Sequence, residues 1–239
     1  MGRVLFGGGK VEMKAPSNGI GDPVFANNDW ATIIEACKSN RVHDTWAIGD
    51  QKLLYIGGDE YLIDIIGKYH DDYADGSGKA PLTFQMHDCY EGDFDNGDGT
   101  FNYGGWASSG IRQSNLPAHL NTMPTEVKEG IAEVKKISSV GGASTQLQET
   151  TDKLFLLSES EVLGTAVLSV PGEGAQYEYY AAGNTSIKKK KSGTYGPWWT
   201  RSANPASSRS FIAIPSHTEH SSESQSCMIL NLLSYAFCF

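Results

Sequence analysis

Two histidines and a glutamate near the C-terminus are residue types that can bind a metal ion. His217, Glu219 and His220 lie close together in the sequence, and imidazole nitrogens with a carboxylate are common zinc ligands. On a helix, the i, i+3 spacing would put both imidazoles on one face. The surrounding residues 215–226 are rich in serine, which argues against a helix. A metal site is therefore the minority interpretation of these residues, and we expect none.

A second candidate is an acidic loop in which Asp93, Asp95 and Asp98 stand among glycines. Carboxylate oxygens on a glycine-rich loop suit calcium. The spacing of an EF-hand is not met, because the fifth position counted from Asp93 is Gly97. We expect a solvated acidic turn first and a calcium site second, and no other cofactor.

Nucleophilic chemistry would have to come from the four cysteines. Cys37, Cys89, Cys227 and Cys238 are widely spaced and form no CxxC motif, so neither a zinc site nor a dense disulfide framework is indicated. Apolar neighbours flank the last two, which predicts buried, unreactive thiols. Catalysis needs a nucleophile, a base and an orienting group in one pocket. The sequence offers no such set, and we expect the protein not to be an enzyme.

The charge balance excludes several partner classes. The formal net charge is -9, which repels nucleic-acid phosphates and anionic lipid. The one basic run, the four lysines 188–191, predicts a solvated hairpin tip, with contact to an acidic neighbouring subunit as the alternative. No run approaches the roughly 18 apolar residues of a membrane span, and no signal-peptide pattern opens the sequence. We expect no nucleic-acid partner, no membrane insertion, and synthesis in the cytoplasm without a signal peptide.

The sequence patterns of helices and strands predict an α+β fold, with short helices on a loop-rich antiparallel sheet that positions the candidate residues. Asp29 begins a helix over 30–37, whose apolar residues recur with helical spacing. β-Branched and aromatic residues over 46–56 and 61–66, with glycine turns between them, predict a meander of strands. Glycine and aspartate dominate residues 71–105, which predicts one long irregular loop.

Further elements are expected in the C-terminal half. They are a short helix over 124–130, strands over 131–137, 151–157 and 211–214, a capped helical turn over 158–164, and final strands over 228–239.

Residues 1–25 contain no complete element and are interpreted as an extended N-terminal arm. Leu5 and Phe6 in this arm need an apolar partner, which is either another subunit or the chain's own core. We expect an assembly arm that contacts other subunits, followed by one domain over 26–239.

Two tryptophans and an arginine are predicted to anchor a loop to the sheet. Trp198 and Trp199 can each bury up to roughly 250 Å². A partly buried guanidinium such as that of Arg201 must find a carboxylate or backbone carbonyls. A structural role for these three residues is therefore preferred to direct ligand contact.

A similar pair brackets the segment 107–110, where Trp106 and Arg112 are expected to pin the long preceding loop onto the sheet. Gly104 and Gly105 would let the backbones approach closely.

Short polar side chains follow the tryptophan pair, over 202–210 and 215–226. They suit adaptable hydrogen bonding on an exposed surface, and they equally suit a loop without a function. The candidate ligand-binding residues are Asn204, Ser207, Ser208, Arg209, His217, Glu219 and His220.

Five landmarks occur in order along the chain. They are WAIGDQK over 46–52, IGKYHD over 66–71, GWASSGIR over 105–112, DKLFLLS over 152–158 with Glu161 and Val162 after it, and WWTRS over 198–202. In this order they resemble the bacterial and phage domain of unknown function whose hallmark is a WWLRS-type segment. That domain is itself similar to the C-type-lectin-like variable proteins that retroelements diversify. The resemblance runs from Asn27 to Phe239.

The resemblance implies a C-type-lectin-like fold, with a sequence-variable surface after the tryptophan pair. The family's last strand usually reads close to Val-Arg-Pro-Ala-Phe. Here Ser234 and Tyr235 replace Arg-Pro, while Ala236 and Phe237 are kept.

The implied function is that of a non-enzymatic bacteriophage virion protein, of tail-fibre or head-fibre type, which binds a host-surface glycan or protein. A purely structural decoration or assembly subunit is the alternative. The fold also resembles that of the formylglycine-generating enzymes, which use cysteines, and such an enzyme is a remote alternative. By analogy we expect a homo-oligomer, with a trimer as the guess, in the phage particle.

Overall fold

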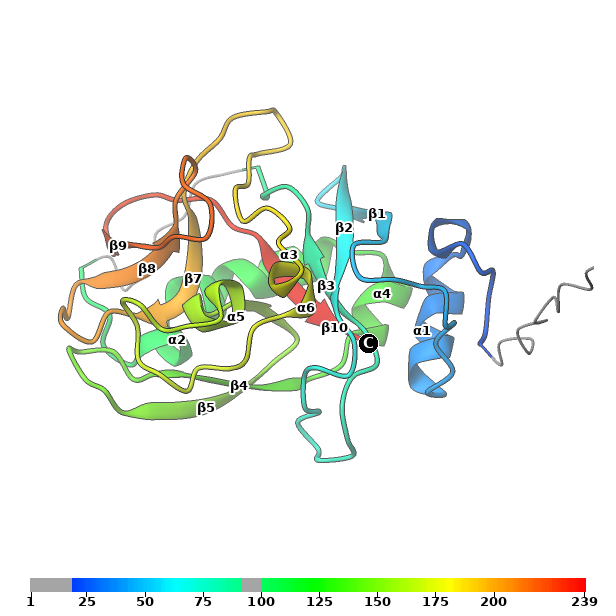
Figure 1. The fold of residues 1–239 in the computed structure, drawn as a ribbon, viewed down its shortest axis with the longest axis horizontal. Helices are drawn as coiled ribbons and strands as arrows, with labels where there is room; N and C mark the ends of the chain where they lie inside the picture. The colour runs from blue at the N-terminus through cyan, green and yellow to red at the C-terminus, as the bar shows by residue number, and fades with distance from the viewer. Residues whose placement is uncertain (1–18, 92–99) are drawn as a thin grey trace, which may run out of the picture.

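The structure of the chain is a computed structural model and describes residues 19–91 and 100–239. The fold is α+β, with short helices around antiparallel sheets (Figure 1). The main sheet has the strand order β1-β2-β3-β10-β6, and every neighbouring pair in it is antiparallel. Its strands are β1 (Gln51–Ile56), β2 (Asp59–Gly67), β3 (Thr83–Met86), β10 (Tyr235–Cys238) and β6 (Leu154–Leu156).

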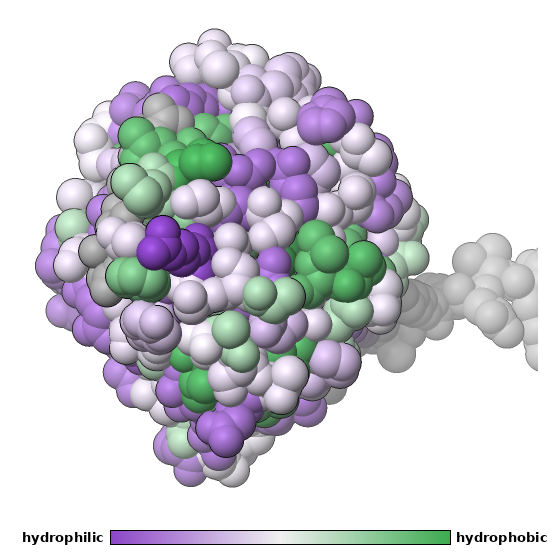
Figure 2. All heavy atoms as spheres, turned by 90° about the vertical axis from the view of Figure 1, so that its left-hand side faces the viewer, coloured by the Kyte–Doolittle hydropathy of each residue, from purple (hydrophilic) through white to green (hydrophobic). Residues whose placement is uncertain are grey.

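Two smaller antiparallel sheets complete the strand structure of the described residues. One is the hairpin of β4 (Val134–Ser139) and β5 (Leu147–Asp152), and the other consists of β7 (Trp198–Ala203), β8 (Ser210–Ile214) and β9 (Glu223–Ser226). The sheet of β7, β8 and β9 lies at the end of the molecule that Figure 2 shows face on. Hydrophobic patches on this face are separate from one another and are surrounded by polar atoms (Figure 2).

The helices are short; two precede the first strand in sequence, and the others lie between strands. They are the 3-10 turn η1 (Phe25–Asn27), α1 (Trp30–Lys38), α2 (Gly105–Ser108), the π-helical turn η2 (Ile111–Asn115), α3 (Leu116–Thr122), α4 (Thr125–Gly130), α5 (Glu159–Leu163) and α6 (Glu178–Ala181). Asp29 caps α1 by accepting a hydrogen bond from the Thr32 amide. Ser158 and Glu161 form a reciprocal capping box on α5. No helix in residues 19–91 and 100–239 combines the length and apolar character needed to cross a membrane.

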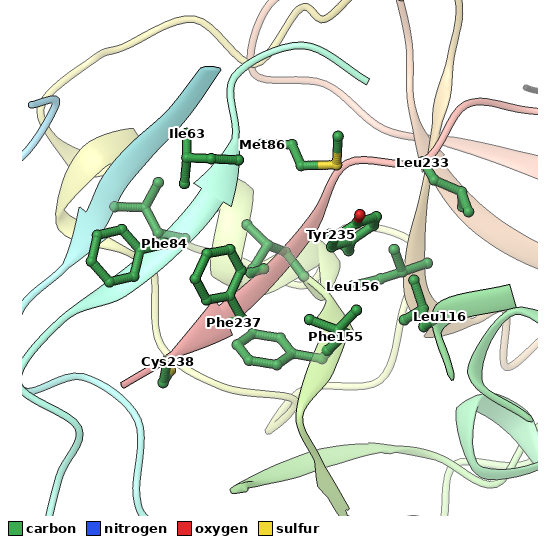
Figure 3. Packing of buried hydrophobic residues seen from close by; sticks show 14 of the residues in the cluster. Ile63, Phe84, Met86, Leu116, Phe155, Leu156, Leu233, Tyr235, Phe237 and Cys238 are labelled. Atoms are coloured by element: carbon green, nitrogen blue, oxygen red, sulfur yellow. The ribbon is translucent and has the colours of Figure 1, made fainter. Parts of the chain in front are cut away.

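The core is built around the last strand of the chain, β10, which lies between β3 and β6 (Figure 3). The rings of Phe84 and Phe237 stack at 5.4 Å, and Phe155 lies on the neighbouring strand β6. Leu116 reaches the same cluster from α3. Because the sheet is covered on both faces here, β3 and β10 are buried at every position instead of alternating.

Most of the predicted elements are confirmed, including the α+β class, the helix after Asp29, the β1–β2 hairpin, the helix α4 and the capped turn α5. The prediction of one irregular loop over 71–105 is wrong, because β3 lies inside it and pairs with both β2 and β10. The strand Thr83–Met86 does alternate polar and apolar side chains, but the pattern is only four residues long and lies in a segment rich in glycine and aspartate.

Two further strand predictions need correction. The single strand predicted over 151–157 is divided, since β5 ends at Asp152 and β6 begins at Leu154 in a different sheet. Of the final strands predicted over 228–239, only Tyr235–Cys238 is a strand, and residues 228–230 form an exposed turn.

Candidate functional site

The Arg201 side chain in β7 is fully buried, and all five of its N–H donors are used. The Nη1 and Nη2 groups both reach the Glu161 carboxylate, the latter at 2.8 Å. The remaining donors bond to backbone carbonyls of Ile137, Leu156 and Glu173. Burial opposes the charge, but the Glu161 carboxylate outweighs it and raises the pKa of Arg201 above its usual value. The arginine thus ties strands of all three sheets to α5.

A second buried cation lies beside this pair. The Lys136 ammonium bonds to Asp71, to Tyr177 Oη at 2.9 Å and to Glu161 Oε1 at 3.3 Å, and it sits 3.9 Å from the Phe155 ring centroid. Burial would raise the pKa of Asp71, but the charge of Lys136 prevails and lowers it to about 2. The two cations and two anions therefore compensate one another inside the protein.

Glu173 is a third buried carboxyl group in this cluster. Its Oε1 accepts the Ser139 amide at 2.7 Å, and its other oxygen accepts the Ser202 hydroxyl. Burial raises the pKa of Glu173 to about 7, more than the hydrogen bonds and Arg201 lower it. These residues adjoin a cavity of about 410 Å³, but their charged atoms are engaged with one another.

The two tryptophans before Arg201 are also interior residues. Trp198 donates its indole N–H to the Ser186 carbonyl at 2.9 Å, and Trp199 packs edge-on against Phe211. Both side chains are fully buried. The WWTRS segment therefore lies in the core and offers no group to a ligand.

Trp106 and Arg112 meet at one carboxylate. Asp152 accepts the Trp106 indole N–H at 3.0 Å and the Arg112 Nε–H at 2.5 Å, and it also accepts the Thr150 hydroxyl. A Cβ at Gly105, which has φ +54°, would collide with the Ser139 carbonyl oxygen. The chain before α2 is thereby held against the β4–β5 hairpin.

The candidate ligand-binding residues lie in two separate connections of the sheet of β7, β8 and β9. Asn204, Ser207, Ser208 and Arg209 occupy the β7–β8 turn, while the other three lie in the β8–β9 connection. These two turns lie at opposite ends of the five-residue strand β8, roughly 15 Å apart at the rise of an extended chain.

The β7–β8 turn uses several of its polar groups internally. Asn204 bonds to the Ala206 amide and to Ser224 Oγ, and Ser207 Oγ accepts the Arg209 amide. The Arg209 guanidinium lies 4.9 Å from the Phe101 ring centroid.

In the β8–β9 connection, Glu219 fastens two loops together. Its carboxylate accepts the Thr185 hydroxyl, the Ser186 amide at 2.8 Å and the Ser186 hydroxyl at 3.1 Å. His217 and His220 are exposed, and the segment is not helical. No group of three or more metal-binding side chains occurs in the described residues.

A cavity of about 550 Å³, lined mainly by residues with polar or charged groups, opens beside Glu219. Its lining includes His87 and Asp88, which follow β3, and it also includes Thr185, Ile187, Lys188, Lys189 and Tyr195. His87 Nδ1 lies 2.9 Å from Asp64 Oδ2, and this carboxylate is buried in β2. Gln51 donates to the same carboxylate at 2.7 Å, so Asp64 is fixed and in turn orients the His87 imidazole.

The run of four lysines 188–191 borders this cavity, and the prediction that it forms a solvated hairpin tip needs correction. A hairpin does form, with Lys189 paired to Tyr195, but Lys188 is not solvated. Its buried ammonium donates to the carbonyls of Met86 at 2.7 Å and His87 at 2.9 Å. Lys191 pairs with Asp59 of the same chain at 2.9 Å.

The cysteines are all free and buried. Burial raises the pKa of Cys37 and of Cys89 to about 12, and it raises that of Cys238 well above its usual value. The acidic residues Asp93, Asp95 and Asp98, for which calcium was the second interpretation, lie outside the described residues, as do the arm residues Leu5 and Phe6.

The sequence motifs did not identify four residues that the structure brings forward. They are His87, Tyr179 and Tyr195, which line the cavity, and Glu173 in the buried cluster. Nothing in the sequence marks them, because they come together only through the pairing of β2 with β3 and the contact of two distant loops.

The protein is an α+β domain with buried ion pairs between Arg201 and Glu161 and between Lys136 and Asp71. The motif residues stabilise its interior, and polar loops lie at its surface. The chain belongs to the family DUF6273, a domain of unknown function, whose model matches residues 85–230. The match includes the landmarks from Gly105 to Ser202, but not those over 46–52 and 66–71, so it is narrower than the expected resemblance. No curated protein and no solved structure matches the chain.

Proposed function

We propose that this chain is a non-enzymatic binding module of a bacteriophage particle, which displays a C-type-lectin-like domain to a host surface. The observation that carries the proposal is a contrast between the motif residues, which lie in the interior, and the turns, which offer polar groups at the surface. The charged and aromatic groups of Trp106, Glu161, Trp198, Trp199 and Arg201 are engaged in the core, whereas the turns at both ends of β8 carry polar side chains that are partly or fully exposed. The phage context and the lectin-like fold rest on the order of the five sequence landmarks.

The non-enzymatic part of the proposal is supported by the state of the reactive groups. The free cysteines are buried, and the carboxylates Asp71 and Glu161 are each paired with a buried cation. A nucleophile and a base that face one cavity would be needed for catalysis. None of these groups is free to take part.

A structural assembly subunit is the second candidate function. It is favoured by the exposed apolar turn between β9 and β10, where Met228, Ile229 and Leu230 are 67%, 44% and 59% exposed. Adjacent exposed apolar side chains are typical of contact sites between proteins. A displayed module must also be attached, so the two functions are compatible.

Binding of the fluorescently labelled full chain to intact cells from a panel of Gram-positive and Gram-negative bacteria tests the proposal. We expect saturable binding to at least one strain. Ser208→Trp in the β7–β8 turn or His217→Trp in the β8–β9 connection should weaken it, because the indole blocks the turn. Glu126→Trp on α4 is the matched control, since this exposed position lies away from β8 (Figure 1).

Absence of binding to every strain, or equal binding by both turn variants, would contradict a host-binding function. If the chain instead co-assembles with particle proteins and Leu230→Asp prevents that, the assembly function is the correct one.

A further inference from the structure

We propose that the cavity between His87 and Tyr195 binds a neutral, hydroxyl-rich ligand of one or two sugar rings. This assignment rests on the proposed binding function and names the class of ligand. The cavity volume of about 550 Å³ lies within the usual range of small-molecule sites.

The hydrogen-bonding groups of the cavity match a polyol. Tyr179, Tyr195 and Ser216 line the cavity and carry hydroxyls, which both donate and accept. Burial, with Asp64 and Glu219 adding to it, raises the pKa of Tyr179 to about 12, so its hydroxyl keeps the proton at neutral pH. Sugar hydroxyls also donate and accept, and these groups can therefore satisfy them in either sense.

The imidazole of His87 adds a directed group. Its Nδ1 is bonded to Asp64, and Gln51 supports the same carboxylate. The other ring nitrogen, Nε2, has no partner among the described residues, and the side chain, which is 35% exposed, lines the cavity. An imidazole fixed by a buried carboxylate is preorganised to bond a ligand without loss of side-chain entropy.

The charges at the cavity are balanced, which argues against a charged ligand. The Lys188 ammonium is engaged with two backbone carbonyls, and the Glu219 carboxylate with Thr185 and Ser186. Lys189 and Asp88 remain, one of each sign, at partly exposed positions. An anion would face Asp88 and a cation would face Lys189, whereas a neutral ligand faces no repulsion.

Tyr195 adds an apolar ring to the lining of the cavity. It is 60% exposed and stands on the hairpin strand opposite Lys189. The flat C–H face of a pyranose ring can stack on a phenol ring, and removal of such a contact together with one hydrogen bond weakens binding about tenfold.

Isothermal titration calorimetry of the full chain with glucose, galactose, mannose, N-acetylglucosamine, maltose and lactose tests the inference. We expect at least one of these saccharides to bind and Tyr195→Ala to weaken that binding about tenfold. Tyr55→Ala is the matched control, because Tyr55 is 54% exposed on β1 and does not line the cavity. This control should bind like the unaltered chain.

Three results would overturn the inference. One is no heat with any of the six saccharides, and another is unchanged binding by Tyr195→Ala. The third is tighter binding of glucose 6-phosphate than of glucose, lost in Lys189→Ala, which would make the cavity an anion site.

Repetition with EDTA separates this cavity from the acidic loop at Asp93. Binding through the cavity should persist in EDTA, whereas binding that requires calcium and survives Tyr195→Ala lies elsewhere. If no saccharide binds but cells are still bound, this inference fails and the proposed function stands. If saccharides bind in the cavity and no cell is bound, the host-surface role fails instead.

Discussion

Arg201 and Glu161 pair through two hydrogen bonds in the protein interior, with both side chains at most 3% exposed. The pair joins β7, the strand that also holds the two tryptophans, to the first turn of α5, 40 residues earlier in the chain. Glu161 Oε2 also accepts the Ser158 amide at 3.0 Å, so one carboxylate caps a helix and neutralises a buried cation.

Glu161→Gln should lower the free energy of unfolding by about 3 to 5 kcal/mol. The amide replaces one acceptor oxygen with an NH₂ group that must face the donors of Arg201 or Lys136, and a buried cation loses its partner. Chemical denaturation with urea measures this change.

Lys191→Met is the matched control for that variant. It removes the Lys191–Asp59 pair, in which both side chains are more than one-third exposed. Exposed pairs contribute little, so this change should stay within about 0.5 kcal/mol. An equal loss in both variants would show that the buried pair has no special structural weight.

Glu173 should make stability depend on pH between its unfolded and folded pKa values. Burial raises the folded pKa to about 7 from the usual 4.5. Protonation is therefore favoured by folding, so the contribution is complete below pH 4.5 and is lost as the pH rises through 7. The loss is roughly 3 kcal/mol at alkaline pH.

Glu173→Gln removes this titration and should be more stable than the unaltered chain at pH 8, with the difference shrinking toward pH 5. Urea unfolding at intervals between these values measures it. Asp71, whose pKa is lowered to about 2, loses its stabilising effect only in more acidic solution and does not interfere. A constant difference between the two proteins across this range would contradict the assignment.

Elements specified by nearby residues could be predicted from the sequence, as α1 illustrates. Asp29 and the Thr32 amide that it caps are three residues apart, and the apolar positions of the helix repeat locally. The strand Thr83–Met86 was missed, because its alternation covers only four residues and its burial comes from β2 and from β10, which is about 150 residues distant.

The same distinction holds for the candidate sites. The sequence predicted that Arg201 needs a carboxylate or carbonyls, but it could not select Glu161 or the Glu173 carbonyl. The cavity at His87 was missed because it depends on β3 and on the loop contact made by Glu219. The residue type therefore predicts which kind of hydrogen-bonding partner a buried group requires, whereas the fold decides which residue supplies it.

Lys188→Met should lower the free energy of unfolding by about 1 to 3 kcal/mol. The change leaves the His87 carbonyl without the Lys188 donor, whereas the Met86 carbonyl keeps the Ser234 hydroxyl. Burial lowers the pKa of Lys188, and relief of this cost offsets part of the loss. Lys189→Met, at the neighbouring half-buried position, should change stability by less than about 0.5 kcal/mol in the same urea experiment. Equal losses of stability in the two variants would instead support the original prediction that all four lysines form a solvated hairpin tip.

The native protein should resist thiol reagents. Burial raises the pKa of Cys37 and of Cys89 to about 12, so at pH 8 roughly one thiol in ten thousand is ionised at either position, and neither sulfur is open to solvent. Ellman's reagent at pH 8 should therefore react slowly with the folded chain and rapidly with all four cysteines in urea. Single Cys→Ser variants assign any residual reactivity. A fast-reacting cysteine in the folded chain would reveal an accessible thiolate, and it would favour the remote alternative of an enzyme that uses cysteine over a binding module.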